Sequence, residues 1–303
     1  MTRRRRPWLA ATAPLLALSL GLAACGDDSG DSGGSQGSGE GSTTPNGELS
    51  EAGKLVPQDI RENGSLTVGT DATYAPNEFL DDDGTTIVGM DIDLFDAVAS
   101  ELDLETDYQS ADFGSIIAGA NSGKYDAGVS SFTINDERKL EVNMVSYFSA
   151  GTQWAAAKGN PKQVNPDSPC GLVVAVQANT VQDQEDLPPK VKACQADGKP
   201  LQVQQYEGQD QATSALVSGK VDAMLADSPV VSYAVQQTGG EIQTVAEVYD
   251  AAPYGYVIPM DDPELADAIQ MALTALADDG TYDKVLKKWG QSDGAINDFA
   301  VNP

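Results

Sequence analysis

The peptide Ser122-Gly-Lys-Tyr-Asp-Ala127 returns almost unchanged as Ser218-Gly-Lys-Val-Asp-Ala223, 96 residues further along the chain (218 − 122). Apolar residues precede each copy at the spacing of one helix face, and a short apolar run follows each copy. Helix, tight Ser-Gly turn and buried strand form the unit of a parallel α/β sheet. We therefore predict two similar α/β lobes; the alternative is a chance repeat of six residues.

Polar residues follow the two predicted strands, but they differ between the copies. Ser130-Ser131-Phe132-Thr133 comes after the first strand, and Asp227-Ser228-Pro229 comes after the second. Ligands of open α/β sheets bind beyond the carboxyl ends of the strands. The sequence therefore predicts a ligand cleft between the lobes, lined by polar groups from both.

The composition limits the function classes. A chain of 303 residues can form two domains of ordinary size, and 18 Lys and Arg against 46 Asp and Glu give a formal charge of −28. That charge makes nucleic acid an improbable partner. Histidine is absent, which removes the commonest general base and metal ligand, so an enzyme would depend on carboxylates or lysines.

The N-terminus has the pattern of a targeting segment. Arg3 to Arg6 precede an apolar run that ends in Leu22-Ala23-Ala24-Cys25, which resembles a bacterial lipoprotein cleavage box. We predict a signal peptide over 1–25, with lipid on Cys25 as the membrane anchor. An ordinary secretory signal or a membrane span is the alternative. Residues 26–57 are predicted as a flexible linker because the segment contains almost no apolar residues before its end.

Cys170 and Cys194 are the two remaining cysteines, and both lie in the predicted second lobe. Disulfides persist in exported proteins, so we predict that the two residues are paired. Two free thiols are the alternative.

Several motifs in the folded part occur in a characteristic order. They are Gly69-Thr70-Asp71-x-x-Tyr74-x-Pro76, Gly89-Met-Asp91-Ile-Asp93-Leu94, Asp112-Phe113, Ser130-Ser131-x-Thr133-Ile-x-Asp136-x-Arg138 and Asp279-Gly-Thr-Tyr-Asp-Lys-Val-Leu-Lys-Lys-Trp-Gly290. Together they resemble the signature of the bacterial extracytoplasmic solute-binding proteins of family 3, the polar amino-acid receptors of ABC importers. Asp91 is expected to cap the helix that follows it.

This resemblance implies an α/β fold of the type II periplasmic-binding-protein class, with a ligand cleft between two lobes. We expect lobe 1 over 58–154 and 252–290, lobe 2 over 155–251, and a C-terminal tail over 291–303 without an assigned role. Strand-like crossings between the lobes are expected near 153–157 and 252–256. The run Asp81-Asp82-Asp83-Gly84 is interpreted as a solvated turn, and neither a metal nor a cofactor is expected.

The two ends of a free amino acid suggest roles for two residues. A carboxylate is matched by a guanidinium, which Arg138 offers, although Arg138 could also be a surface residue. The ligand's ammonium requires an anion, and the resemblance assigns Asp227 to it. The alternative for Asp227 is a polar position just outside a helix that Ser228 caps.

The resemblance assigns the rest of the site as well. Tyr74 and Phe113 would form aromatic walls, although Phe113 could simply pack in the core. Asp71 would select the ligand side chain. Further contacts are expected from the residues that follow strands in each lobe: Ser130, Ser131, Thr133, Gln177 and Thr180. The role of Asn179 stays open.

The predicted function is therefore a monomeric, lipid-tethered receptor outside the cell membrane. It would capture a basic or glutamine-like amino acid and deliver it to an ABC permease without catalysis. One alternative is an extracytoplasmic sensor of amino acids. The other is a dehydratase-like enzyme on the same fold, which would need a carboxylate or lysine base in the cleft.

Overall fold

The structure, a computed structural model, describes residues 49–303. Its large sheet has eight strands in the order β5-β1-β6-β11-β7-β10-β8-β9, and a small sheet has the order β2-β3-β4. The strands of the large sheet are β1 (Ser65–Thr70), β5 (Glu105–Ser110), β6 (Ala127–Gly128), β7 (Val142–Ala157), β8 (Val173–Gln177), β9 (Gln202–Tyr206), β10 (Ala223–Asp227) and β11 (Ile242–Pro259). The small sheet consists of β2 (Thr73–Tyr74), β3 (Glu78–Leu80) and β4 (Ile87–Val88).

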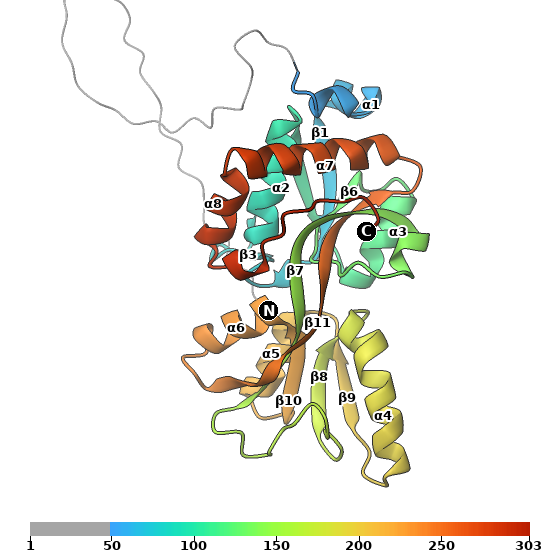
Figure 1. The fold of residues 1–303 in the computed structure, drawn as a ribbon. Helices are drawn as coiled ribbons and strands as arrows, with labels where there is room; N and C mark the ends of the chain where they lie inside the picture. Colours follow the sequence, from blue (N-terminus) through green and yellow to red (C-terminus); the bar gives the residue numbers. More distant parts are fainter. Residues whose placement is uncertain (1–48) are drawn as a thin grey trace, which may run out of the picture. The chain divides into compact units, whose positions relative to one another are not determined.

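The two long strands β7 and β11 are antiparallel and connect the two halves of the large sheet (Figure 1). On one side β11 pairs with β6, which continues into the parallel strands β1 and β5. On the other side β7 pairs with β10, which continues into the parallel strands β8 and β9. The predicted α/β fold with two lobes is confirmed. Lobe 1 contains β1 to β6, and lobe 2 contains β8 to β10.

The crossing between the lobes lies slightly earlier in the chain than the sequence predicted. Residues Thr152 to Ala156 already pair with β10 of lobe 2. The ladder between β7 and β11 is irregular between Val245 and Ala252, with left-handed backbone at Ala246 and Asp250. The predicted boundary at residue 154 is therefore too late, because the chain joins the lobe 2 ladder before that residue.

The two copies of the repeated peptide form the same structure, as predicted. In each copy a helix ends at a Ser-Gly turn whose glycine, Gly123 or Gly219, has a left-handed φ of 73°. The aspartate of each copy then accepts a bond from the neighbouring strand: Asp126 from the amide of Thr67 at 2.7 Å, and Asp222 from that of Val173 at 2.9 Å. The turn and this bond align each strand with its parallel neighbour.

The helices cover the sheet and enclose the cores of the lobes. In lobe 1, helices α2, α7 and α8 pack against one another (Figure 1). The helices of lobe 1 are α1 (Gln58–Asn63), α2 (Met90–Glu101), α3 (Ile116–Asn121), α7 (Pro263–Asp278) and α8 (Thr281–Lys288). Those of lobe 2 are α4 (Leu187–Ala196), α5 (Gln209–Val217) and α6 (Ser228–Gln237). None of the helices in residues 49–303 is long and apolar enough to cross a bilayer.

Both ends of the described chain pack on lobe 1, which corrects the predicted end of the linker and gives a structural role to the tail that the sequence left without one. The linker was predicted to reach residue 57, but Ala52 and Val56 are buried in the lobe 1 core around a short 3-10 turn, Gly53–Leu55. The C-terminal tail also has a structural role, because Phe299 is buried and Val301 bridges to Val145 of β7. The predicted signal peptide 1–25, the lipid-bearing Cys25 and most of the linker lie outside the described residues.

Candidate functional site

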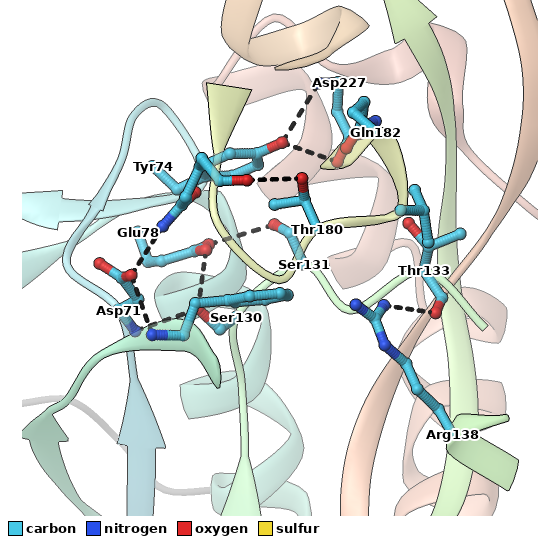
Figure 2. A pocket seen from close by; sticks show the side chains of 13 residues that line it. Asp71, Tyr74, Glu78, Ser130, Ser131, Thr133, Arg138, Thr180, Gln182 and Asp227 are labelled. Atoms are coloured by element: carbon cyan, nitrogen blue, oxygen red, sulfur yellow. Dashed lines mark hydrogen bonds between the residues drawn. The ribbon is translucent and has the colours of Figure 1, made fainter. Parts of the chain in front are cut away.

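One pocket lies where the carboxyl ends of strands from both lobes meet, as Figure 2 shows. All ten predicted ligand-binding residues line this pocket. They are Asp71, Tyr74, Phe113, Ser130, Ser131, Thr133 and Arg138 from lobe 1, and Gln177, Thr180 and Asp227 from lobe 2. The lining also includes Glu78, Val181 and Gln182, which the sequence analysis did not select.

The lobes are closed over this pocket. The cavity volume open to the centre of a water molecule is about 10 Å³, roughly what one water needs. Hydrogen bonds join the lobes across it: Tyr74 to Asp227, and Gln177 to Asp71 at 2.8 Å. A ligand larger than one water molecule can therefore enter only if the lobes separate first.

Arg138 begins a 3-10 turn, Arg138–Leu140. Its amide donates to Oδ1 of Asn135 at 2.9 Å, which fixes the start of the turn. The guanidinium donates to the carbonyl oxygens of Thr133 at 2.8 Å and Asn179 at 3.2 Å. A guanidinium has five N–H donors, so these two bonds orient it and leave donors for a carboxylate.

Arg138 is 7% exposed, and its guanidinium carbon lies 5.4 Å from the ring centroids of both Phe113 and Phe132. Those two rings stack with their centroids 4.5 Å apart. Phe113 therefore both lines the pocket and packs in the core, so neither sequence interpretation was complete. Burial lowers the pKa of Arg138 to about 10, while Asp227 opposes this shift. Arg138 is still charged at neutral pH.

Asp227 ends strand β10 and occupies the N-cap position of α6, one residue before the predicted cap, Ser228. Its side chain makes no capping bond and is directed to the pocket instead (Figure 2). Oδ2 accepts from the Tyr74 hydroxyl at 2.9 Å, and Oδ1 accepts from Nε2 of Gln182 at 2.7 Å. Burial raises the pKa of Asp227, while hydrogen bonds and the charge of Arg138 lower it.

The Tyr74 hydroxyl contacts Asp227 of the opposite lobe. It donates to the Asp227 carboxylate and also accepts from the Asp227 amide at 3.2 Å. A tyrosine of lobe 1 thus contacts the carboxylate that the sequence analysis assigned to the ligand's ammonium.

Asp71 follows strand β1 and is 4% exposed. Its carboxylate accepts from the Thr73 hydroxyl at 2.8 Å and from the Phe113 amide at 3.2 Å. It also accepts the bond from Gln177 of the opposite lobe. Burial raises the pKa of Asp71 to about 6, although these hydrogen bonds oppose the shift.

Ser130 and Ser131 line the pocket, but their polar groups already have partners within lobe 1. The Ser130 hydroxyl donates to Glu78 at 3.1 Å, and the Ser131 hydroxyl lies 3.2 Å from both Glu78 and Asp91. The Ser131 amide, on a left-handed backbone with φ 51°, donates to Asp91 at 3.0 Å. The ligand contact expected of Ser131 stays a prediction, whereas the expected capping role of Asp91 is wrong, because Gly89 occupies the N-cap position of α2.

In lobe 2 the loop after β8 places two more predicted residues. The Thr180 hydroxyl donates to the carbonyl oxygen of Gln177 at 2.9 Å, which closes the loop. Asn179 has a left-handed φ of 66° and does not line the pocket. It contributes its carbonyl oxygen to Arg138 instead.

Glu78 and Gln182, two of the pocket residues that the sequence analysis missed, each lie in a defined local structure. Glu78 is the cross-strand partner of Tyr74 in the small sheet, so an interpretation of 73–80 as a hairpin would have placed both on one face. Gln182 begins a π-helical turn, Gln182–Asp186, a type of turn that is frequent at functional sites. No sequence pattern used above distinguishes that turn.

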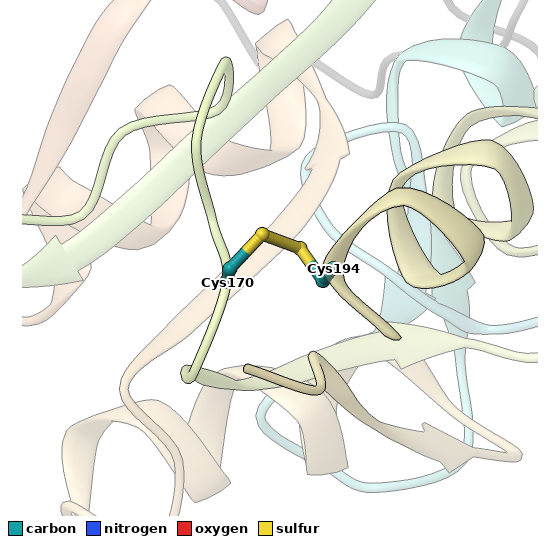
Figure 3. The surroundings of a disulfide bond; sticks show 2 residues. All are labelled: Cys170 and Cys194. Carbon is teal, nitrogen blue, oxygen red and sulfur yellow. A yellow bond between two sulfur atoms is a disulfide. The ribbon is translucent and has the colours of Figure 1, made fainter. Parts of the chain in front are cut away.

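Cys170 and Cys194 form the predicted disulfide, which Figure 3 shows. It joins the loop before β8 to helix α4 across a sequence separation of 24. Closing such a loop stabilises the folded state by roughly 3 kcal/mol in the chain-entropy model. The disulfide does not line the pocket, so its role is to stabilise lobe 2. Within residues 49–303 no group of side chains is arranged to hold a metal ion.

Comparison with known proteins identifies the family to which this fold and pocket belong. The model of the bacterial extracellular solute-binding proteins, family 3, matches residues 66–292, and the chain belongs to this family. The arginine-binding protein ArgT of Corynebacterium glutamicum is 35% identical over 297 residues, which cover 97% of this chain and 95% of ArgT. The lysine/arginine/ornithine-binding periplasmic protein of Escherichia coli is 32% identical over 74% of this chain and 87% of its own length.

A solved structure supports the same conclusion. An ancestral arginine-binding protein bound to arginine superposes with a TM-score of 0.70 at 34% identity, over 75% of this chain and 98% of that chain. The two relatives and the solved structure named here are binding proteins, and each is named for the amino acids that it binds.

Proposed function

We propose that this protein is the substrate-binding component of an ABC importer and that it captures a basic amino acid between its lobes. The observation that carries the proposal is that Arg138 and Asp227 line one pocket from opposite lobes. A zwitterion placed between them satisfies both charges and holds the lobes together.

The charge balance of the pocket favours a cationic side chain. Its ionisable lining residues are the acids Asp71, Glu78 and Asp227, the base Arg138, and Tyr74. Once Arg138 and Asp227 pair with the ligand backbone, two carboxyl groups remain for the ligand side chain. A guanidinium or ammonium offsets the free-energy cost of burying these two carboxylates, whereas a neutral amide does not. The arginine-binding relatives support this preference.

Calorimetric titration with arginine, lysine, ornithine, citrulline and glutamine tests the proposed ligand class. We expect arginine, lysine or ornithine to bind most tightly, with citrulline as the neutral analogue of arginine and clearly weaker. Equal or tighter binding of citrulline or glutamine would contradict the preference for a basic side chain. Absence of binding by all five would contradict the amino-acid assignment.

Replacing Asp71 by asparagine should reduce the preference for arginine over citrulline without abolishing binding. A hydrogen bond to a charged group contributes about 1.5–3 kcal/mol, so the affinity for arginine should fall about 10- to 150-fold. The affinity for citrulline should change much less. Titrations of both ligands with the wild type and Asp71→Asn measure this difference. The exposed Asp267→Asn is a control with the same change in charge.

The pKa of about 6 for Asp71 also predicts a pH dependence. The carboxyl group is ionised above this pH and neutral below it, and a cation stabilises only the ionised form. The Asp71 contribution to arginine affinity should therefore be lost as the pH falls through about 6. Asp71→Asn should lack this contribution. An unchanged pH profile in the variant would show that Asp71 does not face the ligand charge.

The N-terminal pattern supports an extracytoplasmic receptor that lipid on Cys25 tethers to the membrane beside its permease. Replacing Cys25 by serine removes the lipid attachment point, so the protein should be released from the membrane fraction. Fractionation of cells that express each form, followed by immunoblotting, measures this effect. Retention of processed Cys25→Ser in the membrane fraction would contradict the lipoprotein assignment.

A further inference from the structure

Two fully buried carboxyl groups, Glu78 and Asp91, lie together at the base of the pocket. Glu78 is on strand β3 and lines the pocket, whereas Asp91 is on helix α2 and does not. Both side chains are 0% exposed. Burial of two neighbouring carboxylates without a cation is costly, so at least one of them is expected to keep its proton.

The hydrogen bonds around the Ser131 hydroxyl support a retained proton. This hydroxyl accepts from Nδ2 of Asn77 at 2.9 Å. It lies 3.2 Å from Oε2 of Glu78 and also 3.2 Å from Oδ2 of Asp91. A serine hydroxyl has one proton and can donate to only one of the two oxygens. The other contact becomes a hydrogen bond only if a carboxyl group carries a proton itself.

The two carboxyl groups differ in the donors that surround them. Asp91 accepts from the Ser131 amide and the Tyr147 hydroxyl, whereas Glu78 accepts from the Ser130 hydroxyl. The single proton of the Ser131 hydroxyl is available to one of the two carboxyl groups at a time. The proton therefore belongs mainly on Glu78. Burial, Asp91 and Asp71 raise the pKa of Glu78 well above its ordinary value. Burial also raises the pKa of Asp91, to about 6, and hydrogen bonds from Tyr147 and Ser131 limit that shift.

Groups from the other packed elements do not supply a compensating positive charge. Those that act on the pair are Asp71 after β1, Tyr74 on β2, Tyr108 on β5, Tyr147 on β7 and Tyr256 on β11. Arg138 is the cation of the pocket lining, and it is held by the carbonyl oxygens of Thr133 and Asn179. Among the residues that the structure describes, neither Glu78 nor Asp91 has an ion-pair partner.

We propose that Glu78 and Asp91 share one proton while no cationic ligand is bound, and that a cationic ligand side chain expels this proton to solvent. This inference rests on the proposed function. The bound guanidinium or ammonium takes over the charge compensation that the proton provided. Capture of a basic amino acid is then linked to proton release, whereas capture of a neutral one is not.

The pair does not depend on closure of the lobes. Glu78, Asp91 and the serines that bridge them all belong to lobe 1, as does Tyr147 in the lobe 1 part of β7. The proton is therefore held before the ligand arrives and is lost when the ligand side chain reaches Glu78. A preference for cations follows directly, because a neutral side chain leaves the protonated pair unchanged.

Titration calorimetry at pH 7.5 in buffers with different ionisation enthalpies measures the protons released per bound ligand. Arginine binding to the wild type should release about one proton, and binding of its neutral analogue citrulline about none. One released proton corresponds to about a tenfold gain in affinity per pH unit. At this pH the Asp71 contribution, centred near 6, is already complete. Arginine affinity should thus continue to rise above pH 7.

Three variants locate the proton. Glu78→Gln should abolish the release and reduce the preference for arginine over citrulline, and Asp91→Asn should strongly reduce the release. Asp71→Asn should retain it at pH 7.5, although its arginine affinity falls. Exposed Asp267→Asn is the control for a lost surface carboxylate.

The results separate this inference from the function on which it rests. Arginine that binds the wild type without releasing a proton would overturn the shared proton but leave the proposed function intact. Equal release with citrulline would do the same, because the ligand charge would then have no role. Release that persists in Glu78→Gln would assign the proton elsewhere and also overturn the proposal. Absence of arginine binding would remove both proposals. The wild-type comparison of arginine with citrulline is decisive even if a variant does not fold.

Discussion

Arginine binding should be weakened about 30- to 4000-fold when Arg138 is replaced by alanine. The proposed ligand carboxylate then loses its charged partner inside a closed pocket, at a cost of about 2–5 kcal/mol. The guanidinium is oriented by the carbonyl oxygens of Thr133 and Asn179, so its position does not depend on the ligand. Titration calorimetry of Arg138→Ala with arginine measures the loss. Arg61→Ala, which removes an exposed arginine of helix α1, is the matched control.

A ligand analogue distinguishes a carboxylate clamp from a general effect on folding. Agmatine is arginine without its carboxylate, so wild-type protein should bind it much more weakly than arginine. Arg138→Ala should bind the two ligands about equally, since the group that distinguishes them is gone. Thermal unfolding of the variant should stay cooperative, although Arg138 packs on Phe113 and Phe132. Arginine affinity near that of the wild type would refute the clamp and the amino-acid assignment with it.

The sequence predicted those parts of the fold that depend on local pattern. The repeated peptide predicted two helix-turn-strand units, and these form α3 with β6 and α5 with β10. Each aspartate of the repeat bonds to the neighbouring strand, so a short motif determines both the turn and the strand pairing. Seven of the ten pocket residues lie in the motifs that resemble a known family, and the resemblance implied the other three, Gln177, Thr180 and Asp227, outside those motifs.

Pairings between distant segments were not predictable in the same way. The partners of Ser131 depend on how α2 and the small sheet pack beneath the loop after β6. The apolar residues Phe299 and Val301 lie in a polar tail, where local composition suggests no packing. The bond of Tyr74 to Asp227 requires the lobes to meet, which no local pattern can specify. Sequence reasoning therefore selected pocket residues better than it predicted their hydrogen bonds.

Replacing Asp227 by asparagine should weaken arginine binding by about 2–5 kcal/mol, or about 30- to 4000-fold. Asparagine keeps the shape of the side chain and one oxygen for Tyr74 or Gln182, so local packing should be preserved. It cannot balance the buried ammonium of a ligand. Asp197→Asn, an exposed position in the same lobe, is the matched control.

Argininic acid, in which a hydroxyl group replaces the ammonium of arginine, identifies the group that Asp227 meets. The wild type should discriminate strongly against it, because Asp227 would then be left without the ligand's positive charge. Asp227→Asn should lose most of this discrimination but should still discriminate against agmatine, whose missing carboxylate concerns Arg138. Arg138→Ala should thus lose the discrimination against agmatine, and Asp227→Asn should lose the discrimination against argininic acid. A general loss of stability cannot produce this difference between the two variants. If Asp227→Asn kept the wild-type preference for arginine over argininic acid, the ammonium would have to bind elsewhere in the pocket.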